Sequence, residues 1–186
     1  MVNALESDRN FRHYGPLTTL RTSLHASARV QWLLNPGERK ERQMRALMID
    51  LENMIEMRKA VNALTGDHMS EDYVQGRAET VEFIDDKIQD LKDSANALCP
   101  GTSLSTPPDM ASILLKLVDV NTYEGQGVRH LWRTGSAAAH GLYWPKITNP
   151  NPQEWDEEGF HTSLYGTMML VKGALDLYET RATCYV

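Results

Sequence analysis

The chain has 186 residues, of which 41% are hydrophobic and 24% are charged, and its formal net charge at pH 7 is −6. This composition is that of a globular protein with a substantial core, and it excludes a disordered chain. The acidic balance argues against a protein that coats DNA, because non-specific binding to nucleic acid needs an excess of Lys and Arg. A local pocket built from a few arginines is still compatible with that charge.

Cysteine use and the first residues predict a cytoplasmic protein. Cys99 and Cys184 are the only cysteines and lack the spacing of a zinc site, so we expect reduced thiols, with a disulfide between them left open. Residues 1–14 contain no apolar stretch of the kind that secretory signals have. No segment reaches the about 18 apolar residues of a membrane span. We expect no membrane association. The sequence contains no familiar phosphate-loop, nucleophile or zinc motif, so we expect no cofactor and no metal.

Apolar residues recur at helical spacing from the first third of the chain onward. The pattern predicts a first helix that stops at residues 35–37 (Asn-Pro-Gly) and a long second helix that ends near Gly66. A third helix has its apolar face over residues 81–98 and stops at residues 99–101 (Cys-Pro-Gly). We find neither strand-type alternation nor a domain linker in this part of the chain.

The second half continues in the same way. Residues 106–109 (Thr-Pro-Pro-Asp) predict the start of a fourth helix with Thr106 as its N-cap, and residues 121–127 predict a break. A fifth helix is expected over residues 128–140, with Gly141 as a left-handed C-terminal cap. After a loop over residues 144–159, a last helix carries apolar residues at helical spacing. The chain as a whole predicts one all-α domain over residues 1–186, a bundle of about five to six helices.

A polar stripe on the fifth predicted helix carries the chemistry. Its members are Arg129, Arg133, Ser136 and His140. On a helix they fall within roughly 60° of one another, beside three alanines that allow another backbone to approach. An imidazole exchanges a proton near neutral pH, and a guanidinium holds phosphate oxygens in a bidentate fork. The polar stripe therefore predicts either a site that handles phosphate or a buried polar network that bridges helices.

The pair of Arg133 and His140, with six residues between them near a helix end, resembles the R-x(4–6)-H motif of the HEPN superfamily. Those are helical proteins, and many are metal-independent RNases of toxin–antitoxin, abortive-infection and CRISPR systems. Many pair as homodimers whose motifs line a shared cleft. The resemblance implies Arg133 as the phosphate stabiliser and His140 as the general base or acid. It also implies RNA as substrate, a homodimer, and an antitoxin or host factor as protein partner.

The first predicted helix carries a second polar stripe that includes Arg21 and His25. If the first and fifth helices face each other, His25 and His140 flank one cleft as base and acid, with Arg21, Arg129 and Ser136 as supporting binding residues. The other interpretation is a solvated surface stripe. Residues 20–47 are also similar to a pattern in uncharacterised helical proteins of actinobacteria and their phages, which implies no activity.

Two functions follow. The leading hypothesis is a HEPN-like, metal-independent endoribonuclease that acts in phage–host conflict or toxin–antitoxin biology. The alternative is a non-catalytic helical interaction or regulatory protein that uses the same bundle to bind other proteins. A catalytic Arg133 and His140 must be accessible in a cleft, whereas structural ones must be buried with partners.

Overall fold

The computed structural model of the chain describes residues 14–64, 66, 69–142 and 156–182. Within these residues the chain is helical and contains no strand, which confirms the all-α prediction. None of the described helices is long and apolar enough to span a membrane. The six described helices are α2 (Tyr14–Leu34), α3 (Arg39–Ala63), α4 (Glu71–Leu98), α5 (Met110–Leu117), α6 (Tyr123–Ala139) and α8 (Glu157–Ala182).

The chain divides into two compact units. The hairpin unit spans Pro36–Pro108 and contains α3 and α4, whereas α2, α5, α6 and α8 belong to the four-helix unit. The four-helix unit is thus discontinuous in sequence, because the hairpin unit is inserted between α2 and α5. That residues 1–186 form a single domain stays a prediction.

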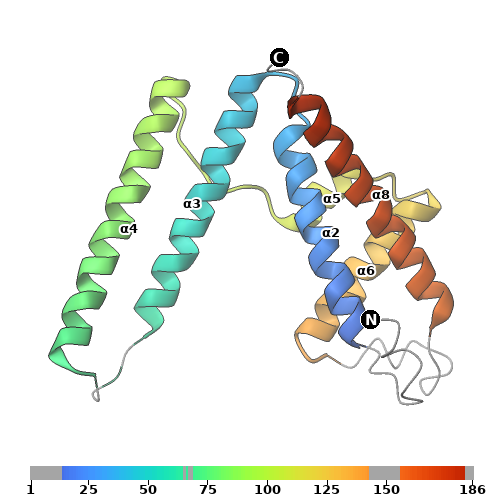
Figure 1. Cartoon of the computed structure of the whole chain (residues 1–186), viewed down its shortest axis with the longest axis horizontal. Coiled ribbons are helices and arrows are strands. Elements are labelled where there is room, and N and C mark those ends of the chain that lie inside the picture. The colour runs from blue at the N-terminus through green and yellow to red at the C-terminus, as the bar shows by residue number, and fades with distance from the viewer. Residues whose placement is uncertain (1–13, 65, 67–68, 143–155, 183–186) are drawn as a thin grey trace. The chain divides into compact units, whose positions relative to one another are not determined.

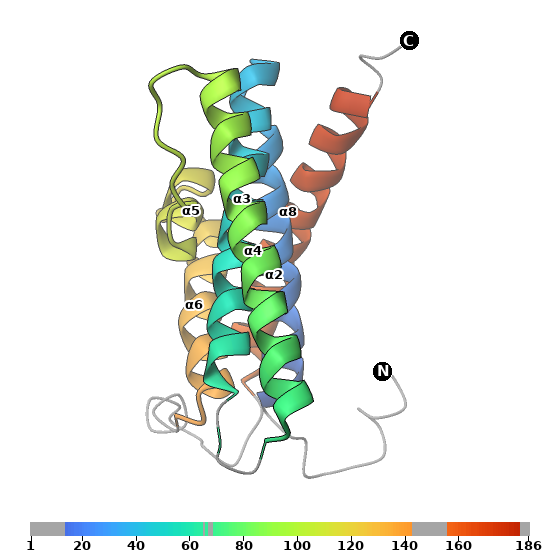
Figure 2. The same cartoon turned by 90° about the vertical axis from the view of Figure 1, so that its left-hand side faces the viewer.

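The hairpin unit consists of two long helices that run antiparallel side by side (Figures 1 and 2). Ser70 caps the start of α4, where its hydroxyl accepts a hydrogen bond from the backbone N–H of Tyr73. An exposed ion pair, Arg58 Nη1 to Asp85 Oδ1 at 2.6 Å, joins the two helices. Their shared core consists of Leu51, Ile84, Ile88, Ala95 and Leu104.

In the four-helix unit α2 packs against α5, α6 and α8, and α6 also packs against α8. Gln31 Nε2 donates to the backbone oxygen of Leu170 at 2.7 Å, and Arg181 Nε donates to that of Leu34 at 3.2 Å. These two bonds place the second half of α2 beside the second half of α8. The side chains that this unit buries most completely include Leu24, Ile113, Val128, Leu131 and Ser163.

Side-chain caps decide where three helices begin, and each start differs from the prediction. Asp109, not Thr106, caps α5, because Asp109 Oδ1 accepts the backbone N–H of Ser112 at 2.9 Å. This bond is also the main reason why the pKa of Asp109 lies below its usual value. Thr122 caps α6 in the same way, so the predicted break over 121–127 is wrong beyond Thr122. Asp156 accepts the N–H of Gly159, and α8 begins inside the predicted loop.

The C-terminus of α6 confirms the predicted left-handed cap. Gly141 has φ +68°, a conformation that a side chain disfavours. The N–H of Leu142 donates to the carbonyl of Ala137 at 2.8 Å, and that of Gly141 donates to Ala138 at 3.2 Å. This pair of bonds is the Schellman motif, which satisfies the last carbonyls of the helix.

Helix α8 buries mostly small residues and exposes several of its large ones. The residues that are buried are Ser163, Gly166, Thr167, Leu170 and Ala174. The apolar residues that the sequence places at helical spacing lie on another face, where Met168, Leu175 and Tyr178 are 59%, 57% and 62% exposed. Small side chains let α8 approach α6 closely, and Tyr123 of α6 shares a hydrogen bond of 2.8 Å with Thr162. Close backbone contact, not side-chain size, therefore selects the buried face.

The contact between α6 and α8 gives a test of this packing. At Gly127 an added Cβ would overlap the backbone carbonyl of Thr162, so Gly127→Ala should force the helices apart and destabilise the protein by roughly 1–3 kcal/mol. At Gly76 of α4 nothing lies within 4 Å of the added atom, so Gly76→Ala should stabilise by about 0.5–1 kcal/mol. Chemical denaturation of both variants checks this, and equal effects would contradict the packing described.

Candidate functional site

In the structure, the residues of the polar stripe of α6 lie in three different surroundings. Ser136 is half-buried and faces α2, whereas Arg129 and Arg133 are exposed beside α5. His140 is exposed and is the C-cap residue of the helix. The four residues therefore lie on one side of α6, but no interaction among the described residues joins them into one site.

Ser136 belongs to a cluster that joins α2 to α6, which we call the α2–α6 cluster. Arg21 Nε donates a hydrogen bond of 3.0 Å to Ser136 Oγ, and the Arg21 guanidinium lies 4.7 Å from the centroid of the Trp132 ring. The His25 ring stacks on Trp132 with centroids 6.3 Å apart and an interplanar angle of 24°. Gly135, buried under Arg21, allows the two helices to meet here. Of the four residues of the polar stripe, Ser136 is the one that these interactions include.

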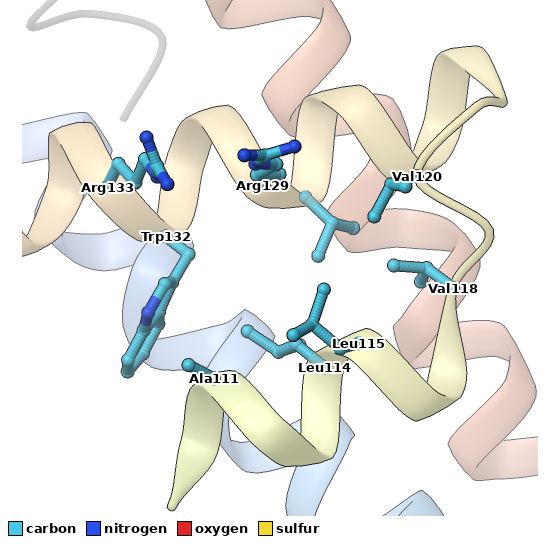
Figure 3. Close-up of a pocket in the computed structure, with 9 residues that line it drawn as sticks. Ala111, Leu114, Leu115, Val118, Val120, Arg129, Trp132 and Arg133 are labelled. Atoms are coloured by element: carbon cyan, nitrogen blue, oxygen red, sulfur yellow. The ribbon is translucent and has the colours of Figure 1, made fainter.

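Arg129 and Arg133 stand apart from that cluster. Within the described part of the chain, neither guanidinium makes a hydrogen bond or an ion pair. Both line a pocket between α5 and α6, together with Trp132 (Figure 3). Two unpaired guanidinium groups one helical turn apart repel each other weakly and offer a fork for an anion.

His140 is held by its backbone and not by its ring. Its N–H donates to the carbonyl of Ser136 at 3.1 Å, whereas its side chain has no partner among the described residues. His25 contacts Trp132, about two turns before His140 along α6. Helix α2 does face α6, which is the condition for a shared cleft, but no described interaction brings His25 and His140 together as an acid and base pair.

Exposure separates the two interpretations of the polar stripe. Arg133 and His140 are both exposed, so they are not members of a buried network. Arg21 and Ser136 are paired and half-buried, so they hold helices together. The catalytic and binding roles of all these residues stay predictions. Among the described residues, no group of three His, Cys, Asp or Glu side chains is placed to hold a metal ion.

Sequence reasoning missed the importance of Trp132. It directly precedes Arg133 in the chain and follows Arg129 by three residues. In the structure its ring links the α2–α6 cluster to the pocket beside α5. The signal available in the sequence was a tryptophan within one helical turn of two arginines.

Comparisons with protein-family models, with curated proteins and with solved structures found no match for this chain. The resemblance to the HEPN superfamily therefore stays a prediction, and the function has to be argued from the side chains themselves.

The division of the arginines into structural and free ones can be tested by stability. Arg21→Gln removes the bond to Ser136 and the contact with Trp132, so it should destabilise the protein by about 1–2 kcal/mol. Arg133→Gln, the matched control on α6, should change stability by no more than about 0.5 kcal/mol because the side chain is exposed and unpaired. Thermal unfolding followed by circular dichroism measures both. A larger loss in Arg133→Gln would show that Arg133 is structural.

Proposed function

We propose that the chain is a non-catalytic helical interaction protein that binds a partner helix through α8. The observation that carries this proposal is the outer face of α8, which we define as Leu164, Met168, Val171, Leu175 and Tyr178. Three of these five large apolar side chains are more than half exposed, and the other two are half-buried. Single exposed apolar residues are common on protein surfaces, whereas a continuous row along one helix marks an interaction site.

The spacing of the outer face supports a helix as the partner. Its residues follow one another at intervals of four, three, four and three, which is the heptad spacing of a coiled coil. The adjoining side of α8 is already buried in the four-helix unit through Ser163, Thr167 and Ala174. Helix α8 therefore has one face for its own unit and a second, separate face for a partner.

The apolar row itself favours a second copy of this chain as that partner. In a symmetric antiparallel pair of α8 helices each copy presents the same heptad-spaced apolar residues to the other, so each outer face covers its counterpart. One flank of the face carries the exposed residues Lys172 and Glu179, and Lys172 already pairs with Asp176 of its own helix. The other flank, with Thr167 and Ala174, is buried in the four-helix unit.

Charged substitutions on the outer face should separate the dimer. We expect the wild-type protein to be dimeric and Met168→Glu/Leu175→Glu to raise the dimer dissociation constant at least about a hundredfold, because four carboxylates would adjoin in the interface. The matched control is Val74→Glu/Phe83→Glu, which changes two exposed apolar residues of α4 and should leave the dimer intact. Sedimentation equilibrium measures the association of each variant.

Circular dichroism must show the same helix content in every variant. A monomeric wild type, or a dimer that the outer-face substitutions do not affect, would refute the proposal.

A metal-independent RNase of HEPN type is the second candidate. It is favoured by the exposure of Arg133 and His140 on the same helix, both with side chains that lack partners among the described residues. A substrate phosphate can therefore reach the guanidinium, and the imidazole is accessible for proton transfer. A role in toxin–antitoxin biology or phage defence, with an antitoxin or host factor as partner, belongs to this candidate.

The nuclease hypothesis predicts cleavage of mixed RNA in the presence of EDTA. His140→Ala and Arg133→Ala should each remove cleavage and leave the melting temperature unchanged, since both residues are exposed. His130→Ala is the matched control, because His130 is an exposed histidine of the same helix. Denaturing gel electrophoresis of the RNA reports the result. Cleavage that survives in His140→Ala would come from a contaminant or another site, and no cleavage by the wild type would favour the interaction protein.

A further inference from the structure

A pocket of about 220 Å³ lies between α5 and α6 in the four-helix unit. In Figure 3 Arg129 and Arg133 project from α6 along its upper border, Trp132 closes one end, and Leu114 and Leu115 rise from α5 below. Apart from the two arginines, every residue that lines the pocket is apolar: Ala111, Leu114, Leu115, Val118, Val120, Val128 and Trp132.

We propose that this pocket binds a small amphiphilic anion, a carboxylate that carries an apolar body. The two guanidinium groups bind the carboxylate and the apolar walls take up the body. This site lies on the α5 side of α6 and does not involve the outer face of α8, so the inference goes beyond the proposed function.

The volume of the pocket limits the size of the apolar part of the ligand. An apolar cavity of about 150 Å³ is sufficient to take up benzene, so the present one accommodates an aromatic ring with a short chain or an alkyl chain of comparable volume. Burial of such a group is favourable because it removes apolar surface of both ligand and pocket from water. Val128 and Leu114, which line the pocket, are almost fully buried and belong to the core, so the inner wall is fixed.

The charge at the pocket mouth selects an anion. Five other cations of the described chain pair with carboxylates, for example Arg45 with Glu41 and Arg58 with Asp85. Arg129 and Arg133 have no such acidic partner among the described residues, although the protein as a whole is acidic. A carboxylate between them would relieve their mutual repulsion and accept charge-assisted hydrogen bonds from both.

Trp132 makes one wall of the pocket rigid before any ligand arrives. Arg21 and His25 of α2 both contact its ring. The α2–α6 cluster thus fixes the Trp132 side chain at the pocket. Ligand binding therefore costs little side-chain entropy at this residue. Preformed, mostly apolar pockets with a few converging polar groups are typical of small-ligand sites.

Titration of the full chain with octanoate tests the proposal. Isothermal titration calorimetry should show saturable binding with a dissociation constant of about 1 mM or tighter. 1-Octanol has the same alkyl chain without the charge and tests the contribution of the carboxylate to affinity. Acetate has the carboxylate without the long alkyl chain and tests the contribution of the apolar part. Both should bind at least about tenfold more weakly than octanoate.

Two variants assign the binding to this pocket. Arg129→Gln/Arg133→Gln should weaken octanoate about tenfold and abolish its preference over 1-octanol. Ala111→Leu should block binding, because Ala111 is exposed at the pocket and a larger side chain fills the space without entering the core. The matched control is Lys92→Gln/Lys116→Gln, which removes the same charge from exposed positions outside the pocket.

The proposal is overturned if octanoate shows no saturable binding up to about 20 mM, or if both pocket variants bind it as the wild type does. Equal affinity for 1-octanol and octanoate would equally overturn it. His140→Ala and Met168→Glu/Leu175→Glu should retain octanoate binding. Failure of the nuclease or dimer proposals is therefore distinguishable from failure of this one.

Discussion

The close contact between α6 and α8 is the constraint on which the four-helix unit depends. Gly127 of α6 meets the backbone of α8 at Thr162, and Gly166 of α8 meets α6 near Val128. Helices that approach through glycine and hydroxyl residues gain dense van der Waals contact, which side-chain bulk would prevent. One consequence is that Met168, Leu175 and Tyr178 have no place in this interface. They lie on the outer face because small residues occupy most of the inner one.

Helix α6 packs against three neighbouring helices at once. Its Gly127 and Val128 contact α8, its Ser136 and Trp132 contact α2, and its arginines line the pocket beside α5. A single turn of the helix therefore combines structural and free polar groups. Arg21 and Arg133 show that the same residue type has different roles: the first is bonded across a helix interface, and the second is exposed without a partner among the described residues.

Much of the fold could be predicted from the sequence because helical periodicity is local. The stop at residues 35–37, the end of α4 at Leu98 and the left-handed Gly141 all depend on residues next to one another. Helix starts were less predictable, since Thr106 and Asp109 are both good caps and the competition between them depends on geometry. The buried face of α8 was unpredictable from periodicity, which ranks Met168 and Leu175 above Ser163 and Gly166. The pocket also escaped prediction, because it requires α5 and α6 to be placed together in space.

The insertion of the hairpin unit between α2 and α5 has a consequence for synthesis on the ribosome. The hairpin unit is one continuous segment, so α3 and α4 are able to pair as soon as Pro108 has emerged. Helix α2 is made first but must wait, because its bond from Arg21 to Ser136 spans 115 residues and that from Gln31 to Leu170 spans 139. During this interval Leu24, Ala28 and Trp32, which are buried in the finished unit, lack the helices that cover them. Within the four-helix unit, helix α2 is therefore the element that needs protection from aggregation for longest.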